Sequence, residues 1–198
     1  MIDVAVGRLL VASLHQSIAD ELPARLEFYE GWLNTAGLRE GRIGLAPLAA
    51  VLSFLRQEDG EAYRVVAARA GEYAAEWAEA ALSPWQRSLI RRAPEWVRVR
   101  LVLRVARTLV RDTYGGSQAR VTWGPQGRGV VGIQGSVFCS VRDRATDPLC
   151  GFYEAAIRRL LRQFDLDVDV GTSECRATGS ARCAMTVVTR AVDAARPS

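Results

Sequence analysis

The side chains best suited to chemistry in this sequence are its four cysteines, Cys139, Cys150, Cys175 and Cys183. Turn-forming residues at 178–180 lie between the last two and predict a hairpin. Such a hairpin would place Cys175 and Cys183 opposite each other on paired strands, with Cβ atoms about 5 Å apart. In a reducing compartment these thiols would be metal ligands or buried thiols rather than disulfides.

Cys150 is expected in the first turn of a helix that precedes this hairpin. Its thiol would then converge with those of Cys175 and Cys183, as in a structural zinc site with Zn–S distances near ~2.3 Å. The alternative is that all three pack as small buried hydrophobic groups. Cys139 alternates with polar residues along a predicted strand and is expected simply in the core.

No catalytic centre is predicted elsewhere in the chain. Residues 127–132 fit a dinucleotide-binding pattern, but their glycines enter a strand and no helix follows to hold a pyrophosphate. The sole histidine, His15, lies in an apolar helix, so neither a catalytic nor a haem-ligating role is expected. Asp165, Asp167 and Asp169 alternate onto a solvent face. The chain is therefore expected not to be an enzyme.

Charge is distributed unevenly along the chain. Residues 1–82 carry 7 Arg and 12 acids, whereas residues 83–198 carry 19 Arg and 10 acids. Two groups of arginines stand out, Arg100, Arg104, Arg107 and Arg111, and Arg158, Arg159 and Arg162. A solvated face paired with the acidic half, within the chain or across a dimer, explains them; an anionic membrane surface or nucleic acid is the alternative. No nucleic-acid motif is present, so no nucleic-acid partner is expected.

The composition indicates a single folded domain. The chain has 198 residues, of which 49% are hydrophobic, enough to build a full core. Charged residues interrupt every apolar stretch before it could span a membrane, and the N-terminus lacks the features of a secretory signal. A cytoplasmic protein without a membrane span is therefore expected.

Hydrophobic spacing predicts helices in the first half. They cover residues 4–22, residues 23–37, a segment from Pro47, a segment from Gly60 through Trp77, a short helix beginning at Ser83-Pro84, and residues 95–112. Residues 97–101 also alternate like a strand, but the length and later spacing of their segment favour a helix.

Alternating patterns predict strands in the second half, at residues 121–123, 131–141, 166–170 and 181–188. A helix beginning at Asp147-Pro148 separates the two pairs. The predicted fold class is α+β: an N-terminal helical layer packed on a four-stranded antiparallel sheet, with one further helix between the strand pairs.

Three segments together resemble a known family. They are the run Cys150-Gly151-Phe152-Tyr153, the hairpin from Glu174 to Cys183, and the upstream helix from Ala62 to Glu72. They resemble the four-vinyl-reductase-type (V4R) domain, which belongs with bacterial phenol sensors and TRAPP trafficking-complex subunits. The expected organisation is N-terminal helices at 1–46 for dimerisation or packing, a V4R-like ligand-binding region at 47–190 and a flexible tail at 191–198, in one compact domain.

The resemblance implies a small-molecule-binding or sensory module that is a homodimer and acts through a downstream protein partner. It implies an apolar ligand in a pocket near Trp77, Phe138 and Phe152. The residues expected to line that pocket are Tyr63, Tyr73, Trp77, Trp123, Phe138, Phe152 and Tyr153. A tetrapyrrole-pathway accessory protein or reductase-like enzyme, and an interaction scaffold without ligand, are the alternatives.

The resemblance also implies zinc, bound by three cysteines and one acid. Cys150, Cys175 and Cys183 take the cysteine positions, whereas the position of the acid falls on Thr172, which is a poor zinc ligand. Glu174, Asp169 or water are further options for the fourth ligand.

Overall fold

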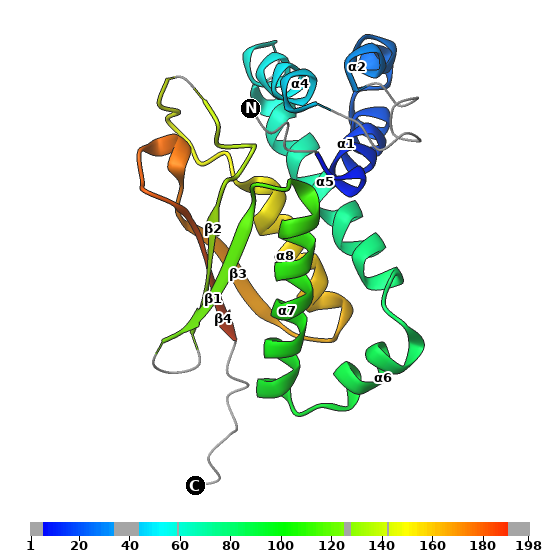
Figure 1. The fold of residues 1–198 in the computed structure, drawn as a ribbon, viewed down its shortest axis with the longest axis vertical. Helices are drawn as coiled ribbons and strands as arrows, with labels where there is room; N and C mark the ends of the chain where they lie inside the picture. Colours follow the sequence, from blue (N-terminus) through cyan, green and yellow to red (C-terminus); the bar gives the residue numbers. More distant parts are fainter. Residues whose placement is uncertain (1–5, 34–43, 59, 125–127, 142, 190–198) are drawn as a thin grey trace, which may run out of the picture.

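The computed structural model describes residues 6–33, 44–58, 60–124, 128–141 and 143–189 (Figure 1). Its helices are α1 (Arg8–Glu21), α2 (Leu26–Leu33), α4 (Leu45–Glu58), α5 (Gly60–Ala80), α6 (Pro84–Arg92), α7 (Glu95–Thr113) and α8 (Gly151–Gln163), with 3-10 turns η1 (Pro23–Arg25) and η3 (Arg176–Thr178). Its strands are β1 (Gln118–Trp123), β2 (Gly129–Gln134), β3 (Val168–Glu174) and β4 (Cys183–Thr189). The predicted helix end at Gly37, the turn at 125–127 and the tail from residue 191 lie outside the described residues.

The strands form one antiparallel sheet in the order β1-β2-β4-β3, so two hairpins meet through β2 and β4. Helices α7 and α8 lie over one face of this sheet, and α5 and α1 lie beyond them (Figure 1). The predicted α+β class is confirmed. Within the described residues, no helix is both long enough and apolar enough to cross a membrane.

The segment whose pattern was ambiguous, α7, is a helix as predicted. Its buried residues Val99, Leu103, Ala106 and Val110 recur every three or four positions and face the core. This longer repeat outweighs the short alternation at residues 97–101.

The predicted strand at residues 131–141 is shorter than expected, because β2 ends at Gln134. Gly135 has a φ of +70°, and a Cβ there would lie 2.1 Å from the carbonyl oxygen of Gly116. This close approach turns the chain out of the sheet. Val137, Phe138 and Cys139 are buried in a turn instead of alternating along a strand.

The start of α8 also differs from prediction, since Cys150, not Asp147, is its N-cap residue. The Asp147 carboxylate pairs instead with Arg64 of α5, at 2.6 Å. The carbonyl oxygen of Cys150 accepts the backbone N–H groups of Tyr153 and Glu154. Cys150 is therefore fixed at the point where an irregular segment enters the helix.

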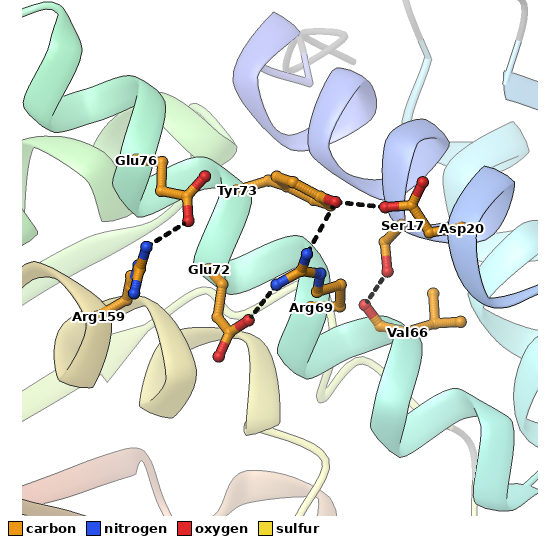
Figure 2. A network of polar contacts seen from close by, with 8 residues as sticks. All are labelled: Ser17, Asp20, Val66, Arg69, Glu72, Tyr73, Glu76 and Arg159. Atoms are coloured by element: carbon orange, nitrogen blue, oxygen red, sulfur yellow. Dashed lines mark hydrogen bonds and ion pairs between the residues drawn. The ribbon is translucent and has the colours of Figure 1, made fainter.

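Helix α5 forms the centre of the helical layers. A Cβ at Gly71 would lie 2.1 Å from the carbonyl oxygen of Phe152, so α5 and α8 touch backbone to backbone there. Polar contacts also join α1 and α8 to α5 (Figure 2). The Ser17 hydroxyl of α1 donates to the Val66 carbonyl at 2.8 Å, and Arg159 of α8 pairs with Glu76 at 2.8 Å.

Candidate functional site

All four cysteines converge at one end of the sheet. Every pair of their sulfur atoms lies within 4.8 Å, and each residue is buried. The shortest separations are 3.2 Å from Cys150 to both Cys139 and Cys175, and 3.5 Å from Cys183 to Cys139. A tetrahedral zinc ion with Zn–S bonds near 2.3 Å would require sulfur atoms about 3.8 Å apart. The cysteine cluster, as we call these four residues, is therefore close to the size of a metal site.

Four different segments bring these sulfurs together. Cys139 lies in the turns after β2, Cys150 caps α8, Cys175 follows β3 and Cys183 begins β4. Backbone N–H groups point at two of the sulfurs: that of Leu149 donates to Cys175 at 3.4 Å, and that of Arg176 donates to Cys183 at 3.5 Å. Such N–H groups stabilise negative charge on sulfur and so favour thiolate ligands.

The thiols perturb one another's ionisation. Hydrogen bonds from the Cys139 and Cys150 thiols lower the pKa of Cys183, whereas the Cys139 and Cys183 sulfurs raise the pKa of Cys150. The cluster thus stabilises one thiolate strongly and resists further ionisation without a cation. A divalent metal supplies that positive charge.

The sequence interpretation found three of these residues and missed the fourth. Cys150, Cys175 and Cys183 meet as predicted, but Cys139 joins them, although it was expected only to fill the core. The change of chain direction at Gly135, which has a positive φ, carries Cys139 to the cluster. The signal available in the sequence was a glycine inside an apparent strand.

Thr172, the residue at the position where the resemblance expects the acidic ligand, bonds to Glu154 and not to the cysteine cluster. Its hydroxyl and its backbone N–H both donate to the same carboxylate oxygen of Glu154, at 2.8 and 3.0 Å. Glu174 pairs with Arg182 at 3.2 Å. In the described part of the chain, the group of candidate metal ligands contains cysteines and no acid.

The residues expected to line a ligand pocket lie in several places. Phe138, Phe152 and Tyr153 pack together with ring centroids 4.8 to 5.6 Å apart and are fully buried. Burial raises the pKa of Tyr153 to about 12, while the nearby hydroxyls of Thr113, Ser117 and Ser136 act to lower it; none of them meets the Tyr153 hydroxyl in good hydrogen-bond geometry. Tyr73 contacts Asp20 and Arg69 at the α1–α5 contact (Figure 2).

The other three members of that set lie near cavities or at the surface. Tyr63 lines the largest cavity, and Trp77 lines a separate apolar cleft. Trp123 is 38% exposed, and the guanidinium of Arg100 lies 5.4 Å from its ring centroid. The structure therefore brings Phe138, Phe152 and Tyr153 together but places the other four apart from them.

The largest cavity, of about 700 Å³, adjoins the cysteine cluster and is called here the loop cavity. Its lining consists of Ala49, Ser53, Arg56, Gln57, Gly60, Tyr63 and Arg64 on the α4–α5 side, and Ser140, Val141, Asp143, Ala145, Thr146, Asp147 and Leu149 on the other side. The Tyr63 hydroxyl donates to the Leu149 carbonyl at 3.2 Å, and Arg56 donates to the Phe138 carbonyl at 3.4 Å. These bonds brace one wall against the other.

A second cleft, of about 560 Å³, lies between α1, α5, α6 and α7. We call it the Trp77 cleft. Its walls are mostly apolar, with Leu9, Leu82, Val105 and Leu109 beside Trp77, and Arg104 and Asp112 supply charge. It is the more apolar of these two spaces, whereas the loop cavity offers the guanidinium groups of Arg56 and Arg64 to the polar end of a ligand.

The remaining sequence candidates form surface contacts. His15 is partly exposed, and its Nε2 lies 2.7 Å from the Glu30 carboxylate, away from the cysteine cluster. Arg159 pairs with Glu76, and Arg87 and Arg91 lie 3.9 Å from Glu79, so some basic side chains do meet the acidic half within the chain.

The chain is similar to known proteins in its structure and not in its sequence. No protein-family model matches the chain, and no curated protein matches its sequence. An H-NOX domain from Shewanella oneidensis in the Fe(II)CO ligation state is similar, with a TM-score of 0.56 and 12% identity over 94% of this chain and 99% of that one. An H-NOX protein from S. oneidensis in the Fe(II)NO state gives 0.54 and 10%, over 93% and 99%.

The phenol-responsive sensory domain of the transcription activator PoxR, solved with phenol, has a TM-score of 0.49 and 15% identity over 74% of this chain and 75% of that one. The structural neighbours thus include a phenol sensor, one of the two kinds of protein named by the sequence resemblance. A trafficking protein particle complex subunit from Naegleria fowleri is the other kind, with a TM-score of 0.49 and 16% identity over 87% and 96%. At these identities the H-NOX likeness shows a shared α+β fold, and function rests on the geometry of the sites.

Proposed function

We propose that this chain is a small-molecule-binding module of the sensory type whose binding wall is organised by zinc. The observation that carries the proposal is the position of the segment from Cys139 to Cys150. Its two ends supply two of the four clustered sulfurs, and residues between them line the loop cavity. Binding a metal at one side of this segment therefore orders the surface that a ligand would meet.

Zinc is the metal that fits these four donors best. Four thiolates in a closed, buried, tetrahedral arrangement are typical of structural zinc. Each sulfur is a ligand, so no coordination position remains for substrate, and the metal has a structural role.

The chain's own residues do not favour iron or a tetrapyrrole in the interior. The H-NOX structures hold Fe(II) with CO or NO. Here the sole histidine lies at the surface bound to Glu30, and the layer between α5, α8 and the sheet is filled by Phe138, Phe152 and Tyr153. A macrocycle would have to displace these rings, so we derive no function through it.

The first test is metal analysis of the purified protein combined with native mass spectrometry. One zinc per chain is expected, and Cys139→Ser should lose it because a neutral hydroxyl replaces a thiolate. Val131→Ala, which also removes buried atoms from the sheet, is the control that should keep zinc. A folded protein without metal, purified from zinc-supplemented cells, would contradict the zinc site. Iron in its place would keep the site but change the metal.

The second test asks where small molecules bind. Phenol and palmitic acid, the compounds bound to two structural neighbours, serve as probes, with NMR chemical shifts as readout. Ser53→Phe fills the loop cavity and Thr108→Phe fills the Trp77 cleft, so each variant controls the other. We expect loss of binding with Ser53→Phe alone. Loss with Thr108→Phe alone would move the site, while no probe binding and no co-purified ligand would favour a scaffold.

The partners implied by the sequence remain part of the proposal. As the sequence resemblance implies, a homodimer and a downstream protein partner would carry the signal. The native mass spectrometry that tests for zinc also shows whether the protein is a homodimer.

A further inference from the structure

The most exposed large apolar side chains gather at one corner of the molecule. Trp85 is 66% exposed, Trp96 65% and Leu89 56%, the highest values among such residues in the described chain. Trp85 and Leu89 are one turn apart on α6, whose opposite side carries the buried Ile90. Figure 1 shows α6 projecting beside the lower ends of α5 and α7. Trp85 and Leu89 are therefore exposed on a projecting helix, and Trp96 is exposed at the start of the next helix, α7.

Arginines outnumber acids around this surface, although Glu79 of α5 lies 3.9 Å from both Arg87 and Arg91. Residues 83–113 contain 8 Arg and only 2 acids. A hollow of about 450 Å³ on α6 is lined by Pro84, Arg87, Ser88, Arg91 and Arg92. Within the described chain, Arg92, Arg104 and Arg107 form no ion pair, and Arg100 lies 5.4 Å from the ring centroids of both Trp96 and Trp123. The hollow thus presents several guanidinium groups next to exposed indole rings.

We propose that α6 and the start of α7 form a docking surface for an anionic phospholipid bilayer. Trp85, Leu89 and Trp96 would enter the headgroup region, where indole rings are enriched. Arg87, Arg91 and Arg92 would bind lipid phosphates, because guanidinium groups hold phosphate oxygens in pairs. We call residues Trp85, Leu89, Trp96, Arg87, Arg91 and Arg92 the docking surface.

Shape and charge favour a bilayer over the other occupants. A two-fold dimer through this surface would place its positive charge against itself. A protein partner would have to enclose a protruding helix, whereas a bilayer accepts protruding apolar side chains directly. Figure 1 places α6 far from α4, which lines part of the loop cavity, and from the β3–β4 hairpin, so this inference is independent of the proposed zinc site.

The test is co-sedimentation of the full chain with vesicles. Binding is expected to phosphatidylcholine vesicles containing about 30% phosphatidylserine and not to pure phosphatidylcholine, and to weaken when salt rises to about 1 M. Trp85→Ser/Leu89→Ser should abolish it, and Arg92→Gln should weaken partitioning about fivefold. Trp32→Ser, which alters a tryptophan 43% exposed on α2, and Arg182→Gln on the β3–β4 hairpin are matched controls that should bind normally.

Several outcomes would overturn the proposal. No binding to anionic vesicles would do so, as would binding that the controls lose but the α6 variants keep. A dimer that Trp85→Ser/Leu89→Ser dissociates would identify the surface as an interface between copies. Because the substituted side chains are exposed, unchanged melting temperatures of all variants confirm that folding is intact. Inorganic phosphate that displaces the protein completely at low millimolar levels would identify a free-anion site instead of a membrane surface.

Discussion

The helical layers and the cysteine-bearing end of the sheet are held together by different means. Around α5, contact is continuous: α5 touches α8 backbone to backbone at Gly71, and apolar side chains such as Val66 and Ala74 are completely buried. Around the cysteine cluster, the described residues from 135 to 150 form no regular helix or strand. Continuous packing stabilises the first region, whereas sulfur contacts and single hydrogen bonds, such as that from Tyr63 to Leu149, hold most of the second.

This difference has a consequence for dynamics. A region stabilised by many small contacts loses stability gradually when any one of them is removed, but a region held by one metal centre depends on all of its ligands together. If a metal organises the wall of the loop cavity, as proposed, that wall would be ordered or released as a unit.

Removal of the proposed zinc should produce the largest difference in stability between the two regions. Chelation of the zinc, or Cys150→Ser, is expected to lower the free energy of unfolding by about 4 kcal/mol, the effect of losing a ligand present at about 1,000 times its Kd. Hydrogen exchange should accelerate at residues 139–149 and in the β3–β4 hairpin, while α5 and α8 stay protected. Uniform acceleration across all helices would show that the two regions are not distinct.

The contact between α5 and α8 predicts the next largest effect. In Gly71→Ala the new Cβ meets the Phe152 carbonyl, so the helices must separate, and we expect a loss of about 1–3 kcal/mol in unfolding free energy. Gly31→Ala in α2 is the matched control, because a Cβ there has no atom within 4 Å. That control should be neutral or stabilising by up to about 1 kcal/mol. Equal effects in denaturant melts would remove the case for a close α5–α8 contact.

These two regions also differed in how far the sequence could predict them. Helical periodicity identified α5 and α7 because many positions repeat the same signal, so errors at single residues average out. The cysteine cluster depends on individual residues: Gly135 diverts the chain, and Cys139 then reaches Cys150 at 3.2 Å. Alternation along residues 131–141 could not reveal this diversion, since the pairing of Gly135 with Gly116 is a long-range backbone contact.

The ligand-lining residues illustrate the same limit. An aromatic residue at a helical position predicts burial, which Phe152 and Tyr153 confirm. Whether neighbouring rings leave a cavity depends on how three elements meet, and here Phe138 from an irregular segment fills the space against Phe152 at 4.8 Å. Pocket geometry therefore could not be derived from the spacing of aromatic residues.

A smaller change in unfolding free energy is expected at Tyr153, whose ring lies in the aromatic core. The Tyr153 hydroxyl is buried without a partner, and so is the hydroxyl of Ser136. Removing an unpaired buried hydroxyl relieves its desolvation, so Tyr153→Phe should leave unfolding free energy unchanged or raise it by about 1 kcal/mol. Tyr63→Phe, which breaks the bond to Leu149, is the comparison and should be destabilising. A clear loss of stability in Tyr153→Phe would indicate that the Tyr153 hydroxyl bonds to a nearby hydroxyl, that of Thr113, Ser117 or Ser136.

The smallest effect concerns the surface contact between α1 and α5 in Figure 2. The Tyr73 hydroxyl donates to the Asp20 carboxylate and, with Gln16 and Arg69, holds the pKa of Asp20 below its usual value. A lowered pKa means that the contact stabilises the fold above the ordinary Asp value and that this contribution is lost as pH falls through the folded pKa, in acid below about pH 4. Tyr73→Phe should raise the Asp20 pKa in an NMR titration, whereas Tyr114→Phe, at a distant turn, should not. Because both side chains are solvated, the melting temperature at neutral pH should hardly change. A large drop would mean that this surface contact, rather than the buried α1–α5 interface with its bond from Ser17 to Val66, joins these two helices.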